Sequence, residues 1–242
     1  MDLAGSLLSA GVGLASGLMA PRLIAGVPDI EPDPSEDPGD FPEAVPFAVL
    51  GRRPRLRARL AALGLVIGLM LGAVFGFSWG TGLFLVALPY LLALATIDYT
   101  TWFLPNRLIL PACLAVAVTA IVAAIALSAP SIVGDAALGG VGLSAWYGLF
   151  WFISPRSLAF GDVKLGGLLG LVLGPFGLSA TVLSVLAAGV ISLLALIPMR
   201  LAGNAINQGE TTGVMRAHVP FGPSMIAGAI VSVLVARALG TA

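Results

Sequence analysis

Residues 107–127 read RLILPACLAVAVTAIVAAIAL, and after Arg107 this stretch contains no charged residue. About 20 apolar residues are enough for a helix to cross a hydrocarbon core of ~30 Å. The run is continuous and lacks the regularly spaced polar positions of a soluble amphipathic helix. It therefore predicts a transmembrane helix.

The rest of the chain has the same character. Of its 242 residues, 58% are hydrophobic and 10% are charged, whereas soluble domains carry roughly 25% charged residues. We expect an all-α polytopic membrane protein with about eight transmembrane helices, of which the sixth is the shortest. The predicted spans lie near residues 3–24, 60–77, 80–97, 107–127, 132–153, 163–177, 179–199 and 219–239.

The positions of the basic residues predict the orientation of these spans. Arg and Lys near the ends of spans are retained on the cytoplasmic side of a membrane. With the amino terminus outside, only Arg237 falls on the outer side against this rule, so we expect that topology. The basic residues that then lie on or near the inner side are Arg52, Arg53, Arg55, Arg57, Arg59, Arg107, Arg156, Lys164, Arg200 and Arg216.

Three regions follow from this layout. Residues 1–27 hold the first span, which Asp2 and Arg22 flank in the reverse order to a secretory signal peptide, so we expect it to be retained. Residues 28–59 form a cytoplasmic loop, whose acidic, Pro-rich half predicts a mobile segment and whose basic half predicts an anchor for lipid headgroups. Residues 60–242 form the main membrane-embedded domain.

Composition also excludes some partners and cofactors. The formal net charge is zero, which gives no field to attract nucleic acid. The chain has one cysteine, Cys113, and one histidine, His218, too few for a disulfide or a tetrahedral zinc site. We expect no cofactor and no metal. The bilayer is the expected surrounding, and the sequence gives no oligomeric state.

Few carboxylates lie outside the termini and the acidic loop, and each needs an explanation in so apolar a chain. Asp98 ends the third predicted span and Asp162 opens the sixth, both at cytoplasmic ends. Taken singly, Asp98 is explained as a solvated residue and Asp162 as a helix cap. Asp135 follows Ser131, a predicted cap, at the outer start of a span, so we interpret it as structural. Glu210 lies in the polar stretch NAINQGETTG and is interpreted as a solvated loop residue.

Taken together, Asp98 and Asp162 predict a catalytic pair. Like charges ~4 Å apart repel by about 4 kcal/mol at an effective dielectric of 20, so two adjacent carboxylates share one proton. The ionised partner then draws a proton from water, and the protonated partner donates to the developing oxyanion of a peptide bond. As a hypothesis, the two carboxyl groups lie within ~10 Å of each other around a water-accessible pocket.

The residues around this pair resemble the type IV prepilin peptidases, a family of membrane aspartic proteases with a GxGD-type signature. The resemblance covers the chain from about residue 80 onward. It rests on Asp98 followed by LPNRLILP, on FGDVKLGGLLGLVLG around Asp162, and on VPFGPSMIAGA at 219–229. The stretch GLASGLMAPRL in the first span is a weaker likeness.

The resemblance implies that Asp98 and Asp162 are catalytic, with Gly161, Lys164, Pro105 and Asn106 in support; from the residues alone, Asn106 is also a candidate cap for the fourth span. It implies an endopeptidase in the inner cell membrane of a prokaryote. Its expected substrates are prepilins or pseudopilins, whose positively charged leader is cut at the cytoplasmic face.

The chain departs from the family at two places. Ala159 stands where the signature usually begins with Gly, and the first cytoplasmic loop lacks the cysteine motifs of the bifunctional members. Methyl transfer and zinc binding are therefore not carried over to this chain.

Three other functions compete with this one. A small ion- or proton-coupled transporter would place acidic residues near the membrane midplane and show an internal repeat, neither of which is evident. A non-catalytic assembly protein of a pilus or secretion system would use its aspartates only as caps. A presenilin-type protease would have a Tyr-Asp step, whereas Ile97 precedes Asp98 and Tyr99 follows it.

Overall fold

The structure is a computed structural model. It describes residues 3–29, 45–154, 158–201, 206–207, 217–218 and 220–241. Most of the acidic half of the first loop therefore lies outside the described residues. The same holds for Asp2, Arg156, Glu210 and Arg216, and for the side chains of Arg200 and His218.

The described part of the chain is almost entirely helical, which confirms the expected all-α membrane fold. Within the described residues, a helix lies in each of the eight predicted spans, and six of these helices are long and apolar enough to cross a membrane. The elements in chain order are α1 (Leu3–Ala25), α2 (Phe47–Gly51), α3 (Leu56–Phe75), α4 (Trp79–Thr101), α5 (Asn106–Ala126), α6 (Ser131–Ile153), α7 (Phe160–Leu173), the 3₁₀ turn η2 (Gly174–Phe176), α8 (Leu178–Leu201), the short antiparallel strands β1 (Ile206–Asn207) and β2 (Ala217–His218), and α9 (Gly222–Ala238).

The outer surface of the bundle is apolar. Large side chains such as Leu114, Ile125 and Leu138 are 66%, 75% and 74% exposed. Exposed apolar surface on this scale marks contact with something other than water. A helix satisfies most of its backbone hydrogen bonds internally, which is the condition for crossing hydrocarbon. The surface therefore suits a lipid bilayer.

Glycines let two pairs of helices pack backbone against backbone. At Gly17 of α1, a Cβ atom would lie only 2.6 Å from the Cα of Ala61 in α3. At Gly139 of α6, it would lie 2.9 Å from the Cα of Gly174, at the end of α7. Small residues allow such close approach in membrane helices. The first span is thus packed tightly into the bundle.

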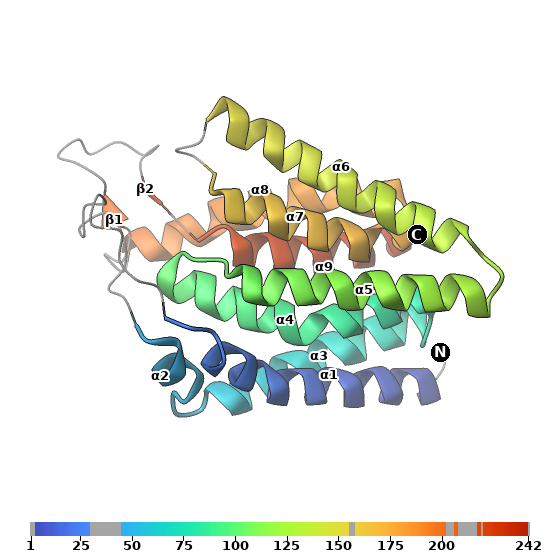
Figure 1. The fold of residues 1–242 in the computed structure, drawn as a ribbon, viewed down its shortest axis with the longest axis horizontal. Coiled ribbons are helices and arrows are strands. Elements are labelled where there is room, and N and C mark those ends of the chain that lie inside the picture. The colour runs from blue at the N-terminus through green and yellow to red at the C-terminus, as the bar shows by residue number, and fades with distance from the viewer. Residues whose placement is uncertain are drawn as a thin grey trace.

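The helices run alternately up and down, so their ends fall into two groups. Figure 1 shows both termini at one end of the bundle and α2, β1 and β2 at the other. The second end also holds the carboxyl end of α4 and the first residues of α7 and α9. Asp98 and Asp162 lie at this second end. Its assignment to the cytoplasm remains a prediction.

Two predicted helix caps are wrong. Pro105 and not Asn106 occupies the position before α5, and Pro130 and not Ser131 occupies the position before α6. Neither helix has a side-chain cap. Proline is favoured at helix starts because it fixes φ and lacks the amide that would otherwise need a partner.

Candidate active site

Asp98 lies in the last turn of α4, and its side chain is only 4% exposed. The interpretation as a solvated residue is therefore wrong. Its Oδ2 accepts a hydrogen bond of 2.9 Å from the backbone N–H of Gly222, far along the chain. A buried carboxylate is stable only when such partners replace its lost water.

The donor of this bond belongs to the first turn of α9. Phe221 precedes the helix and provides no side-chain cap, so the first amides need partners from elsewhere. The Asp98 carboxylate takes one of them and also faces the positive end of the helix dipole. A Cβ at position 222 would lie 2.7 Å from Asp98 Oδ2, so the contact requires glycine.

Asp162 lies in the first turn of α7 and is 6% exposed. Its Oδ2 accepts a hydrogen bond of 3.1 Å from the backbone N–H of Ala159, the residue before the helix. Asp162 thus caps the start of α7, as its interpretation as a helix cap predicts. Because a carboxylate has two oxygens with four acceptor positions, this bond leaves capacity for chemistry.

The replacement of Gly by Ala at position 159 does not strain the backbone. Ala159 has φ −78° and ψ 150°, an extended conformation that any residue adopts. A glycine would be needed there only for a positive φ or for a close approach. The departure from the family signature therefore leaves the start of α7 intact.

The fold brings the two aspartates together. Asp98 and Asp162 lie close enough for their charges to interact, and α4, α7 and α9 pack against one another around them. Neither side chain lines either of the two cavities described for the molecule. Both residues are buried, with only 4% of Asp98 and 6% of Asp162 exposed.

The four predicted supporting residues surround Asp162 and the loop that follows α4. A Cβ at Gly161 would lie 3.0 Å from the Cβ of Leu104, so the start of α7 packs against that loop beside the buried Pro105. Lys164 Nζ donates a hydrogen bond of 2.9 Å to Asn106 Oδ1. These contacts tie α7 to the loop.

Lys164 also lies 4.7 Å from the ring centre of Phe160. The lysine stands at the outside of the site, and its neighbours are an amide and an aromatic ring.

Three residues of this region were missed by the sequence analysis. Gly222 and Phe221 were noted only as part of the stretch at 219–229, without a role. Tyr147 in α6 was not singled out, although it is one of three tyrosines. It is 5% exposed, it lies within electrostatic reach of Asp162, and its ring meets that of Phe221 edge-on at 6.0 Å. A buried tyrosine in an apolar span is the one signal that could have marked it.

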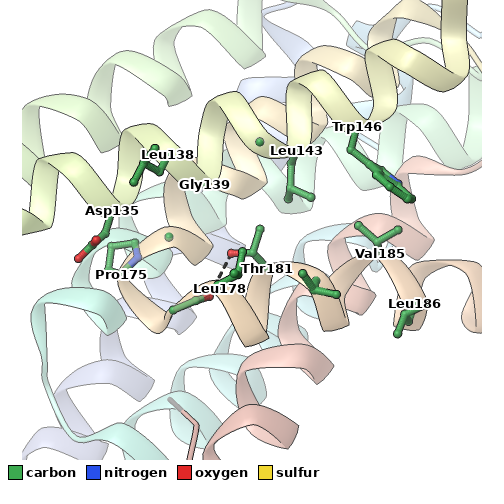
Figure 2. Close-up of a pocket in the computed structure, with 14 residues that line it drawn as sticks. Asp135, Leu138, Gly139, Leu143, Trp146, Pro175, Leu178, Thr181, Val185 and Leu186 are labelled. Carbon is green, nitrogen blue, oxygen red and sulfur yellow. Dashed lines mark hydrogen bonds between the residues drawn. The ribbon is translucent and has the colours of Figure 1, made fainter.

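The larger described cavity, of about 630 Å³, lies elsewhere, between α6 and α8. Figure 2 shows its apolar lining, with Asp135 and Pro175 together at one end and Trp146 and Val185 facing each other farther along. Asp135 is exposed and borders this cavity. Among the described residues, no group of three His, Cys, Asp or Glu side chains is placed to hold a metal ion.

Two buried carboxylates within electrostatic reach are suited to proton transfer. One can hold a proton while the other carries the charge, so the site can act as acid and base in a single step. Such a pair titrates as a unit, and the proton belongs to both residues.

The comparison with known families agrees with this reading of the residues. Residues 85–197 match the family model described as the type IV leader peptidase family. The matched segment contains both aspartates and all four supporting residues, and it confirms the resemblance seen in the sequence. It indicates a protease of the leader peptidase type in a membrane setting. No curated protein and no solved structure matches the chain.

Proposed function

Because residues 85–197 carry the pattern of the type IV leader peptidase family, we propose that this chain is a membrane aspartic endopeptidase. It removes the leader peptide from prepilin or pseudopilin-like proteins at the cytoplasmic face of the inner membrane of a prokaryote. Methyl transfer is not part of the proposal.

One observation carries the proposal above the others. Asp98 and Asp162, which are 64 positions apart in the sequence, are both buried at the same end of the bundle, and their charges interact. Burying two carboxylates together is costly unless they share a proton. Structural capping would need neither the burial of Asp98 nor the closeness of the two groups.

The reaction follows from this pair. The ionised carboxylate takes a proton from a water molecule as the water oxygen attacks the scissile carbonyl carbon. The protonated carboxyl group donates to the carbonyl oxygen as it gains negative charge. Proton transfer to the leaving nitrogen then breaks the peptide bond. The backbone bonds from Gly222 and Ala159 hold the two carboxylates in place.

The burial of both carboxylates adds one requirement. Water and the substrate backbone reach the pair only if the helix ends around it separate. The site lies where loops join α4 to α5 and α6 to α7, and loops open at lower cost than packed helices. We infer that the substrate enters with its own apolar helix in the bilayer and its charged leader at the loop end.

The proposal is tested by expressing the chain with a tagged prepilin-like substrate in membranes. The new amino terminus of the substrate is determined by mass spectrometry. The wild-type chain is expected to cut between the charged leader and the apolar helix, and Asp98→Asn and Asp162→Asn to leave the substrate whole at normal protein level.

Asp135→Asn is the matched control, because Asp135 is exposed and borders the cavity between α6 and α8. This variant is expected to cut like wild type. Cutting by both Asn variants of the pair, or no cutting of several substrates by the wild type, would lead us to abandon the proposal.

A further inference from the structure

The two carboxylates are held by amides that belong to different helices. Asp98 is bonded to Gly222 at the start of α9, whereas Asp162 is bonded to Ala159 at the start of its own helix, α7. The distance between the carboxylates therefore depends on the relative position of the first turns of α7 and α9. A side chain packed between the two helix starts can fix that relation.

Tyr147 of α6 lies between these two helix starts. A Cβ at Gly166 would lie 2.5 Å from Tyr147 Cδ2 and 3.2 Å from Cε2, so the ring packs directly on α7. Gly166 follows Asp162 by four residues and therefore lies on the same face of α7. The ring thus covers the face that carries the carboxylate.

The same ring reaches α9. Its centre lies 6.0 Å from that of Phe221, with the two planes at 71°, which is the edge-to-face arrangement that aromatic pairs prefer. Phe221 is the residue before Gly222, whose amide holds Asp98. Tyr147 is 5% exposed and has little freedom to move.

We propose that Tyr147 is a positioning residue, whose ring sets the separation of Asp98 and Asp162 by packing between Gly166 of α7 and Phe221 of α9. The inference rests on the proposed function. It assigns the role to the ring and not to the hydroxyl group, because the ring makes both packing contacts. A misplacement of ~1 Å at a catalytic group can lower a rate about 100-fold.

The test compares Tyr147→Phe with Tyr147→Leu in purified protein reconstituted into lipid, with a prepilin-like substrate. Tyr147→Phe keeps the ring and is expected to retain kcat within about threefold. Tyr147→Leu is expected to lower kcat roughly 100-fold, with KM within about threefold, because the substrate-binding surface is unchanged. Phe152→Leu on the same helix is the control, since Phe152 is 77% exposed, and it is expected to match wild type.

A second pair of variants probes the contact itself. Gly166→Ala pushes against the Tyr147 ring and is expected to lower kcat in the wild-type background. In the Tyr147→Leu background it is expected to add little further loss, because the obstructing ring is gone and the two changes act on one contact. Additive losses would contradict a shared role.

Three results would overturn the inference. Tyr147→Phe could lose as much activity as Tyr147→Leu, which would assign the role to the hydroxyl group. Tyr147→Leu could cut like wild type, or could raise KM with kcat unchanged. A wild-type chain that does not cut, or active Asp98→Asn and Asp162→Asn variants, would instead overturn the proposed function and with it the role of Tyr147.

Discussion

Asp98 and Asp162 each accept one hydrogen bond from a backbone N–H at the start of a helix. Backbone donors are fixed by the helix that carries them, so they hold a carboxylate more rigidly than a long side chain does. Each of these bonds goes to Oδ2, and the hydrogen bonds found at the two residues include none to Oδ1. We propose that water and substrate reach those Oδ1 oxygens once the helix ends around the pair separate.

Gly222→Ala tests the hold on Asp98. The new Cβ would lie 2.7 Å from Asp98 Oδ2, so the carboxylate has to shift. We expect kcat for cleavage to fall roughly tenfold or more, because the carboxylate leaves the position in which the Gly222 amide holds it. Gly82→Ala on α4 is the control, since a Cβ there meets nothing within 4 Å. Equal rates for the two variants would count against a held carboxylate.

Substitution of Lys164 tests the hydrogen bond to Asn106 that ties α7 to the loop after α4. Its hydrogen bond to Asn106 is exposed, and the net value of such a bond is about 1 kcal/mol. We expect Lys164→Ala to lower the free energy of unfolding by no more than about this amount. A double-mutant cycle with Asn106→Ala, measured by thermal unfolding in detergent, should give a coupling of the same size. Purely additive losses would mean that the bond does not form in solution.

At the scale of elements, the positions of the membrane helices could be predicted from the sequence and the contacts of the site could not. Each span is a local apolar run, so the run near 107–127 predicts α5 (Asn106–Ala126) within a residue. The burial of Asp98 depends on Gly222, which lies 124 positions away. No local pattern shows that contact, and none shows that Tyr147 packs against Phe221.

The predictions of the two helix caps were wrong for a different reason. Asn106 and Ser131 are residue types that favour caps, and a preceding proline competes for the same position. Pro105 and Pro130 occupy it in both helices. The aspartates themselves were found because charges are rare in this chain, which makes each one informative.

The pair α1 and α3 offers a prediction at this scale. A leucine at Gly17 has no room, because the backbone of Leu60 and Ala61 already fills the space. We expect Gly17→Leu to lower the free energy of unfolding by about 3 kcal/mol. Gly11→Leu on the same helix is the control, as a Cβ there meets nothing within 4 Å. Thermal unfolding in detergent distinguishes them, and equal stability would contradict the packing.

At the scale of the whole molecule, the topology places both termini on one side and the candidate site on the other (Figure 1). With the amino terminus outside, a cysteine at Thr241 should react with a membrane-impermeant maleimide on intact cells. A cysteine at Arg53, between α2 and α3, should react only after the membrane is opened. Both are made in a Cys113→Ser background, because Cys113 is the natural cysteine of the chain. The reverse labelling would invert the topology and place the site outside.

The central claim is that Asp98 and Asp162 act as one unit, and single-turnover cleavage by purified protein tests it most directly. Wild type is compared with Asp98→Asn, Asp162→Asn and the double variant. Residues that act as a unit lose activity non-additively. We predict that each single variant falls by roughly 1,000-fold or more and that the double variant falls no further. Substantial activity in either single variant, or a double variant that loses the product of the two single effects, would contradict the account.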